Sequence, residues 1–328
     1  MRAMVLHTIG QPLQLEERPQ PTPAAGQMLI KVQACGVCRT DLHLFDGELP
    51  QARLPRVPGH EIVGEVTAVG AQVASDWIGR RVGVPWLGWT CGVCEFCRSG
   101  RENLCDQALF TGCQLDGGYA DYTVADARFC FPLPDTLEAA EAAPLLCAGL
   151  IGFRALQMAQ NAPHLGLYGF GAAAHLAIQV AVGRGQQVYA FTRPGDDSGQ
   201  DYARSLGATW AGASDQLPPH LLDASLIFAP RRRTGAAGLA SHRQRRLRGV
   251  RRHSHERYPH LSLSPVVAGA QRAFSSQPDP RGRRGVFFEQ IQRTPVHCNV
   301  TCYPLVQANQ ALERLRSGQV NGAIVLIP

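Results

Sequence analysis

The chain has 328 residues, enough for two domains with their own cores, and 45% of them are hydrophobic. Its net charge of +6 comes from one block: residues 231–285 hold fourteen Arg, one Glu and one Asp, a balance of +12, and the rest is therefore about −6. Overall charge thus gives no argument for nucleic-acid binding. We expect no signal peptide and no membrane span, so eleven cysteines indicate metal-bound or free thiols in a reducing, cytoplasmic setting.

Two motifs in the amino-terminal half carry metal-binding side chains. After a strand expected at Met4–Leu6, the first motif, Gly36–His43, contains Cys38, and the second, Gly59–Gly64, reads GHE-x2-G and contains His60. A catalytic zinc needs three protein ligands and one open position, and thiolate and imidazole are both suitable ligands. The two motifs therefore predict part of a catalytic zinc site.

Four cysteines follow at the spacing C-x2-C-x2-C-x7-C, namely Cys91, Cys94, Cys97 and Cys105. Four thiolates this close together suit a tetrahedral metal, and zinc is the natural occupant of a closed all-sulfur site. Free cysteines, disulfides or an iron–sulfur cluster are the alternatives. Because we expect no secretion signal, and because the motifs in front of the cluster carry metal-binding side chains, zinc is favoured.

Residues 165–193 predict a strand, a glycine turn, a helix and a second strand. The turn reads G-x-G-x-x-A at Gly169, Gly171 and Ala174, which permits a tight turn, close approach of a pyrophosphate and packing of helix on strand. The second strand ends at Thr192 and Arg193, where an NAD-binding unit usually carries an acid. A cation there favours the 2′-phosphate of NADP, and NAD stays an alternative.

Taken together, the motifs resemble those of the zinc-containing alcohol dehydrogenases of the medium-chain dehydrogenase/reductase family, over residues 1–230 and 286–328. The resemblance implies an α/β fold with a GroES-like β-barrel zinc domain (1–150 plus 290–328) and a Rossmann doubly wound parallel sheet (151–289). It also implies two zinc ions per chain, and oxidation of an alcohol to an aldehyde or ketone with hydride transfer to NAD or NADP.

The same resemblance assigns the catalytic zinc to Cys38, His60 and Cys147. It places Glu61 behind the metal, where the carboxylate can approach it during ligand exchange. Considered alone, Cys147 would be interpreted as a small buried hydrophobic residue, and Glu61 as a surface carboxylate.

Helper residues are implied between the two motifs. Thr40 and His43 match a proton relay that runs through the cofactor ribose, and a histidine suits its exit because it titrates near neutral pH. Asp41 matches a carboxylate that orients the ligand histidine. Arg39 matches a contact to the cofactor pyrophosphate.

Residues 231–285 depart from the family pattern, because only eight of these 55 residues are Leu, Ile, Val or Phe. A nucleic-acid-binding insertion and a solvated loop are two interpretations. A third is a pair of compensating frameshifts near 230 and 285, since synonymous codons for Arg248–Val267, read one nucleotide later, give the family-like text VVCAGIHMSDIPTFPYRLLW.

The frameshift hypothesis has consequences for partners and activity. It removes later strands of the cofactor sheet, together with the edge that the family uses for subunit pairing, so a homo-oligomer would lack that edge. The alternative function is then a zinc-loaded but catalytically inactive product. Otherwise we expect a small alcohol or aldehyde as partner, and neither nucleic acid nor membrane.

Overall fold

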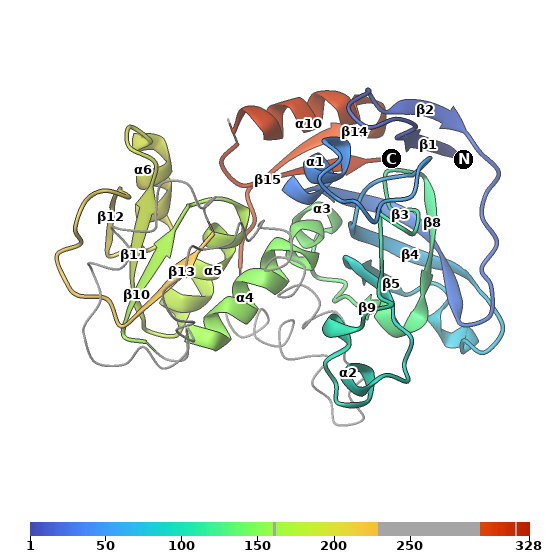
Figure 1. Ribbon diagram of the computed structural model, residues 1–328, viewed down its shortest axis with the longest axis horizontal. Coiled ribbons are helices and arrows are strands. Elements are labelled where there is room, and N and C mark those ends of the chain that lie inside the picture. Colours follow the sequence, from blue (N-terminus) through green and yellow to red (C-terminus); the bar gives the residue numbers. More distant parts are fainter. Residues whose placement is uncertain (160–161, 229–295, 319) are drawn as a thin grey trace. The chain divides into compact units, whose positions relative to one another are not determined.

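The computed structural model describes residues 1–159, 162–228, 296–318 and 320–328 (Figure 1). These residues form two compact units. The first contains Met1–Leu150 and Cys298–Pro328, and the second contains the described parts of 151–228 together with 296–297. The frameshift hypothesis for 231–285 and the expected pairing edge lie outside the described residues.

A seven-stranded sheet organises the first unit. Its strand order is β14-β15-β3-β4-β5-β9, with β8 also paired to β3. The strands are β3 (Gln27–Val37), β4 (Glu61–Val69), β5 (Arg81–Val84), β8 (Tyr122–Asp126), β9 (Phe131–Pro132), β14 (Val300–Pro304) and β15 (Ala323–Ile327). All pairs are antiparallel except β14 with β15.

The core of the first unit follows from alternation along the long strands. Met28 and Ile30 of β3, Ile62 and Val66 of β4, and Ile324 of β15 are fully buried in one apolar cluster. Successive side chains of a strand point to opposite faces, so these strands each give one face to the core. The strand β3 leads into the first of the two predicted metal-binding motifs, and β4 begins within the second.

Smaller elements surround this sheet. Two further strand pairs are β1 (Arg2–Val5) with β2 (Gln14–Glu17), and β6 (Leu87–Trp89) with β7 (Leu109–Phe110). The helices are α1 (Arg39–Phe45), α2 (Glu95–Arg98), α3 (Ala139–Ala142) and α10 (Ala308–Ser317), and the 3-10 turns are η1 (Ser75–Trp77), η2 (Glu102–Leu104), η3 (Ala127–Phe129), η4 (Ala143–Leu146) and η6 (Leu305–Gln307).

The carboxy-terminal helix α10 packs beside α1. Arg316 of α10 donates two hydrogen bonds, of 2.7 and 2.8 Å, to the carboxylate of Asp46, which caps α1, and its guanidinium lies over the ring of Phe45. The helix ends where Gly318 adopts the left-handed conformation expected of a glycine at that position. Gly318 is therefore the glycine C-cap of this helix.

The second unit is built on a parallel sheet. The strands β10 (His164–Tyr168), β11 (Gln187–Thr192), β12 (Trp210–Ala213) and β13 (Ala224–Ile227) lie in the order β12-β11-β10-β13. The helices are α4 (Ala148–Ala159), which begins at the boundary of the units, α5 (Ala172–Gly183) and α6 (Asp197–Ser205). The strand order reverses between β10 and β13, as it does between the two halves of a doubly wound dinucleotide-binding sheet.

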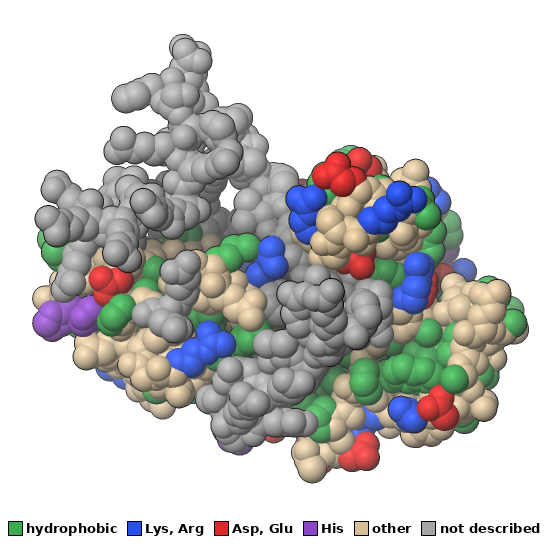
Figure 2. Space-filling view, turned by 90° about the horizontal axis from the view of Figure 1, so that it is seen from below, with side chains coloured by type: hydrophobic (Ala, Val, Ile, Leu, Met, Phe, Trp, Pro, Cys, Tyr) green, Lys and Arg blue, Asp and Glu red, His purple; other side chains and the backbone are tan. Residues whose placement is uncertain are grey.

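The distribution of charged side chains on the surface and the length and composition of the helices complete the description. On the face in Figure 2, the Lys and Arg side chains of the described residues lie scattered among polar and hydrophobic ones rather than gathered in a patch. None of the helices in the described part of the chain could cross a membrane by itself; Ala139–Leu146 and Ala148–Ala159, with a 49° bend between them, reach the required length and composition only as a pair.

Candidate metal centres and dinucleotide turn

Cys38 is held at the junction of a strand and a helix. It follows the end of β3 and is the N-cap of α1, with extended backbone angles of −109° and 158°. Its backbone N–H donates to Asp41 Oδ2 at 2.8 Å, which satisfies an amide at the helix start. The local fold thus fixes the direction of the Cys38 side chain.

Three more side chains meet Cys38. His60 and Glu61 come from the start of β4, Cys147 follows η4, and one ligand atom from each of the four residues lies within 4.8 Å of the others. The two sulfurs of Cys38 and Cys147 are 3.6 Å apart. The structure therefore brings together all the residues that the resemblance assigns to the catalytic zinc, and it puts Glu61 inside the donor group. We call these four residues the Cys38 cluster.

The Cys38 cluster has the composition and burial of a zinc site. His60, Glu61 and Cys147 are all at most 3% exposed. Neither ring nitrogen of His60 has a hydrogen-bond partner among the described residues, although Nδ1 lies 3.4 Å from Asp41 Oδ1. A buried polar atom without a partner is costly, and a metal at Nε2 removes that cost. Two sulfurs, one imidazole nitrogen and one carboxylate oxygen are donors that zinc accepts.

The pKa shifts of the side chains in the Cys38 cluster support the same interpretation. The Cys147 thiol and the nearby His60 ring hold the pKa of Cys38 well below its ordinary value, against the effect of burial. Its contact with Cys38, together with burial, raises the pKa of Cys147, and burial together with the Cys38 charge raises the pKa of Glu61. A divalent cation would allow all three groups to be anionic together, because metal binding displaces their protons.

Asp41 connects the cluster to its surroundings. This carboxylate is 4% exposed, and its Oδ1 accepts from the Gly59 backbone N–H at 3.2 Å and faces the His60 ring. Its Oδ2 accepts from the Cys38 backbone and from the hydroxyl of Tyr119 at 3.2 Å. Asp41 and Glu61 are therefore buried groups of the site, not surface carboxylates.

Two neighbours shape the cluster. A Cβ on Gly36 would overlap Glu61 Oε2 and lie 2.9 Å from Glu61 Cβ, so this position leaves room only for glycine. The indole of Trp86 meets the His60 ring edge-on, at 4.8 Å between centroids, and stacks on Phe110 at 5.0 Å. Both contacts restrict how the metal-binding side chains can move.

The predicted relay residues lie on α1. Thr40 is 8% exposed and its Oγ1 is 3.7 Å from Cys38 Sγ, whereas Arg39 is exposed. His43 is three residues after Thr40, which places both on one side of the helix. Nδ1 of His43 pairs with Oε2 of Glu48, a partner closer to solvent.

The four-cysteine lobe forms a second cluster. Its sulfurs lie within 4.8 Å of one another, with Cys91 at 3.9 Å from Cys97 and 3.6 Å from Cys105. Backbone hydrogen bonds from Val93 and Cys94 lower the pKa of Cys91 to about 6, so this thiol readily becomes a thiolate. The donor set and its closeness fit a closed structural zinc site.

The second unit carries the expected dinucleotide turn. Gly169 has a φ of 87°, a conformation that glycine adopts freely, and Ala174 is fully buried. Gly171 is the N-cap of α5 without a side-chain cap, and no heavy atom of the described residues lies within 4 Å of the place where its Cβ would be. The helix amino terminus is thus open to an anionic group, which fits a pyrophosphate.

The end of β11 has no carboxylate. Thr192 is 3% exposed, and its hydroxyl accepts a hydrogen bond from the Gln200 side chain at 3.2 Å. Arg193 follows and is exposed. The position beside the turn therefore presents a cation to solvent.

Comparison with known proteins agrees with this geometry. Residues 24–135 match the family model described as alcohol dehydrogenase GroES-like domain. Over 323 residues the chain is 39% identical to a probable alcohol dehydrogenase of Mycobacterium tuberculosis (strain CDC 1551 / Oshkosh), a match that covers 96% of this chain and 93% of that one. The chain belongs to the zinc-containing medium-chain alcohol dehydrogenase family.

Solved structures with the same fold support the assignment. A cobalt- and zinc-bound thermostable alcohol dehydrogenase from Pyrobaculum aerophilum has a TM-score of 0.80 and 25% identity, covering 100% of this dehydrogenase and 99% of that chain. Acetophenone reductase from Geotrichum candidum NBRC 4597, in complex with NAD, has a TM-score of 0.79 and 25% identity, covering 100% and 97%. The predicted family and fold class are confirmed.

The sequence interpretation of this dehydrogenase missed two residues of the site, and it described a third, Trp86, as core or as lining of a substrate pocket. The structure places Trp86 in the core, where it contacts the ring of His60. Gly36 lies inside a strand, where an isolated glycine often marks a close approach by another group. Tyr119 follows the pair Gly117–Gly118, and that pair could have indicated close backbone packing.

Proposed function

We propose that this dehydrogenase interconverts an alcohol and an aldehyde or ketone, with NAD or NADP as its hydride carrier. The observation that carries the proposal is the buried Cys38 cluster, with its ligand atoms within 4.8 Å of one another. A zinc ion held there supplies Lewis-acid chemistry toward an alcohol or carbonyl oxygen. The open turn at Gly169–Ala174 supports binding of the dinucleotide.

Each residue of the site then has a role. Cys38, His60 and Cys147 would hold the metal, and the carboxylate of Glu61, which belongs to the same donor group, would approach it during ligand exchange. The hydroxyl of Thr40, which lies beside the cluster, would take up the substrate proton and at the same time pass on its own. His43 would take up the relayed proton and release it toward Glu48 and solvent.

Zinc analysis combined with activity tests this proposal. The purified chain should contain two zinc ions and oxidise small alcohols with NAD or NADP. Cys147→Ser should lose one zinc and lower kcat/KM, whereas Cys302→Ser, an exposed cysteine outside both clusters, should keep both ions. A Cys147→Ser protein that still holds two zinc ions would contradict the ligand assignment.

Cofactor choice has its own test. Arg193 supports a preference for NADP, because a guanidinium can pair with a 2′-phosphate. Arg193→Ala should raise KM for NADP and leave KM for NAD nearly unchanged. An unchanged ratio of the two constants would contradict the role of Arg193.

A second candidate function is a zinc-loaded but inactive protein from a frameshifted gene. The composition of residues 231–285 and the shifted text of Arg248–Val267 support it. Coding DNA read across residues 225–290 tests the frameshift, and cofactor titration by fluorescence tests the inactivity. Two bound zinc ions without cofactor binding would favour this candidate; saturable binding of NAD or NADP would exclude it.

A further inference from the structure

Tyr119 is a buried side chain that no step of the proposed reaction uses. Its ring is fully buried, and its hydroxyl donates to Asp41 Oδ2 at 3.2 Å. Asp41 in turn faces Nδ1 of His60 at 3.4 Å. A phenylalanine would fill the same space without placing a hydroxyl in the core, so this polar contact needs an explanation.

We propose that Tyr119 is a positioning residue for the catalytic zinc, because its hydroxyl fixes the Asp41 carboxylate in the orientation that aligns His60. The proposal rests on the function proposed above, since it needs a metal at the Cys38 cluster. Tyr119 is not one of the four residues whose ligand atoms form the Cys38 cluster.

Hydrogen bonds from segments outside α1 are needed to fix the orientation of the Asp41 carboxylate. The Cys38 backbone N–H, at the start of the same helix, reaches Oδ2. The last torsion of an aspartate side chain is broad and roughly two-fold, so one such bond leaves the carboxylate plane weakly determined. The Tyr119 hydroxyl and the Gly59 backbone N–H approach from other segments, one at each oxygen, and together they hold the plane.

Close backbone packing brings Tyr119 to this place. Gly117 N–H donates to Val57 O at 2.8 Å, and Tyr119 N–H donates to Pro58 O at 3.0 Å. A Cβ on Gly117 would overlap the carbonyl oxygens of Pro58 and Gly59, so the two segments can approach only with glycine there. The segment that leads into His60 and the segment that carries Tyr119 are therefore aligned directly against each other.

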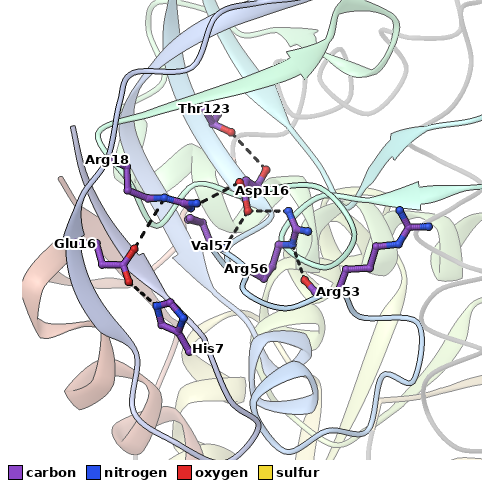
Figure 3. A network of polar contacts seen from close by, with 8 residues as sticks. All are labelled: His7, Glu16, Arg18, Arg53, Arg56, Val57, Asp116 and Thr123. Atoms are coloured by element: carbon purple, nitrogen blue, oxygen red, sulfur yellow. Dashed lines mark hydrogen bonds and ion pairs between the residues drawn. The ribbon is translucent and has the colours of Figure 1, made fainter.

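A polar network on the surface anchors the same two segments (Figure 3). Asp116, just before the glycine pair, accepts from Arg56 at 2.7 Å and from the Val57 backbone N–H at 3.1 Å. Arg18 lies 3.9 Å from both Asp116 and Glu16 and so extends the network to β2. This anchoring limits movement of Tyr119 relative to the ligand histidine.

Zinc release from the full-length protein tests the proposal. In Tyr119→Phe, the zinc of the Cys38 cluster should bind about 10- to 100-fold more weakly in competition with a chelator, the usual effect of removing a group that orients a metal ligand. The four-cysteine lobe of the same chain is an internal reference, and its zinc should be released as before. Cys147→Ser identifies which release phase belongs to the Cys38 cluster.

Two further variants sharpen the test. Tyr122→Phe removes a hydroxyl from a half-buried tyrosine on β8 and should leave both zinc affinities unchanged. In an Asp41→Asn background, Tyr119→Phe should add little to the loss already present, because the two residues act in series.

The outcomes separate this inference from the proposed function. Cobalt substitution should show an altered absorption spectrum at the Cys38 cluster in Tyr119→Phe. An affinity within about 2-fold of the unsubstituted protein, equal loss from both clusters, or additive effects with Asp41→Asn would overturn the role of Tyr119. Absence of the second zinc from the unsubstituted protein would instead overturn the proposed function and this inference with it.

Discussion

His175 should make the stability of the second unit depend on pH. It lies on α5, is 1% exposed, and comes four residues after Gly171. Burial lowers its pKa to about 4, and the backbone at Gly171 and Ala172 opposes this only in part. The positive end of the helix dipole also disfavours a charged ring so near the amino terminus of α5.

The expected magnitude follows from the pKa difference between the folded and unfolded states. The value falls from 6.5 to about 4, and each pKa unit corresponds to about 1.4 kcal/mol. Because the unfolded chain binds the proton first, stability is complete above the unfolded pKa of 6.5 and is lost as the pH falls to about 4. The loss attributable to His175 should reach about 3 kcal/mol in this almost fully buried position.

Urea unfolding over this pH range measures the effect. The free energy of unfolding of His175→Gln should fall less steeply below pH 6.5 than that of the unsubstituted protein, although the variant starts lower at neutral pH. His220→Gln, which replaces an exposed histidine of the same unit, should keep the original slope. Equal slopes for His175→Gln and the unsubstituted protein would refute the conclusion that burial keeps this ring neutral.

Two further substitutions test contacts of the first unit. Gly36→Ala should displace Glu61, destabilise the protein by about 1–3 kcal/mol and lower its zinc content, as measured by thermal unfolding and metal analysis; an unchanged zinc content would contradict the close contact. Arg316→Ala removes the pair with Asp46, whose pKa the hydrogen bond from Arg316 lowers, and should cost less than about 1 kcal/mol because both side chains are at least one-third exposed. That contribution should be present above pH 3.8, the ordinary pKa of the carboxyl, and disappear below it, and a loss independent of pH would point to the stacking on Phe45 instead.

Local patterns predicted the parts of the site whose residues lie close together in sequence. The spacing of the four cysteines largely determines how their sulfurs are arranged, because a short loop leaves few other arrangements. The glycine turn was also predictable from a local pattern, because each of its small residues meets a requirement of the backbone at that position. Cys147 differs: its sulfur meets that of Cys38 across 109 residues, and only the resemblance to a family identified it.

Contacts made by tertiary packing were not predictable. Tyr119 reaches Asp41 across 78 residues, and no periodicity or spacing connects the two. The element boundaries near the carboxy terminus also depend on such packing. The strand β14 begins at Val300, where its pairing with β15 begins, and the helix α10 begins at Ala308 because Leu305–Gln307 forms a 3-10 turn.

The pairing of β15 with β3 has a consequence for the order of events during synthesis. Residues 35–37, which lead directly into Cys38, hydrogen-bond to residues 324–326. A nascent chain therefore cannot close this sheet while the ribosome still holds the last strand. Zinc insertion at the Cys38 cluster should consequently be completed only after that strand has left the exit tunnel, whereas the four-cysteine lobe, formed within Cys91–Cys105, can capture its ion while translation continues.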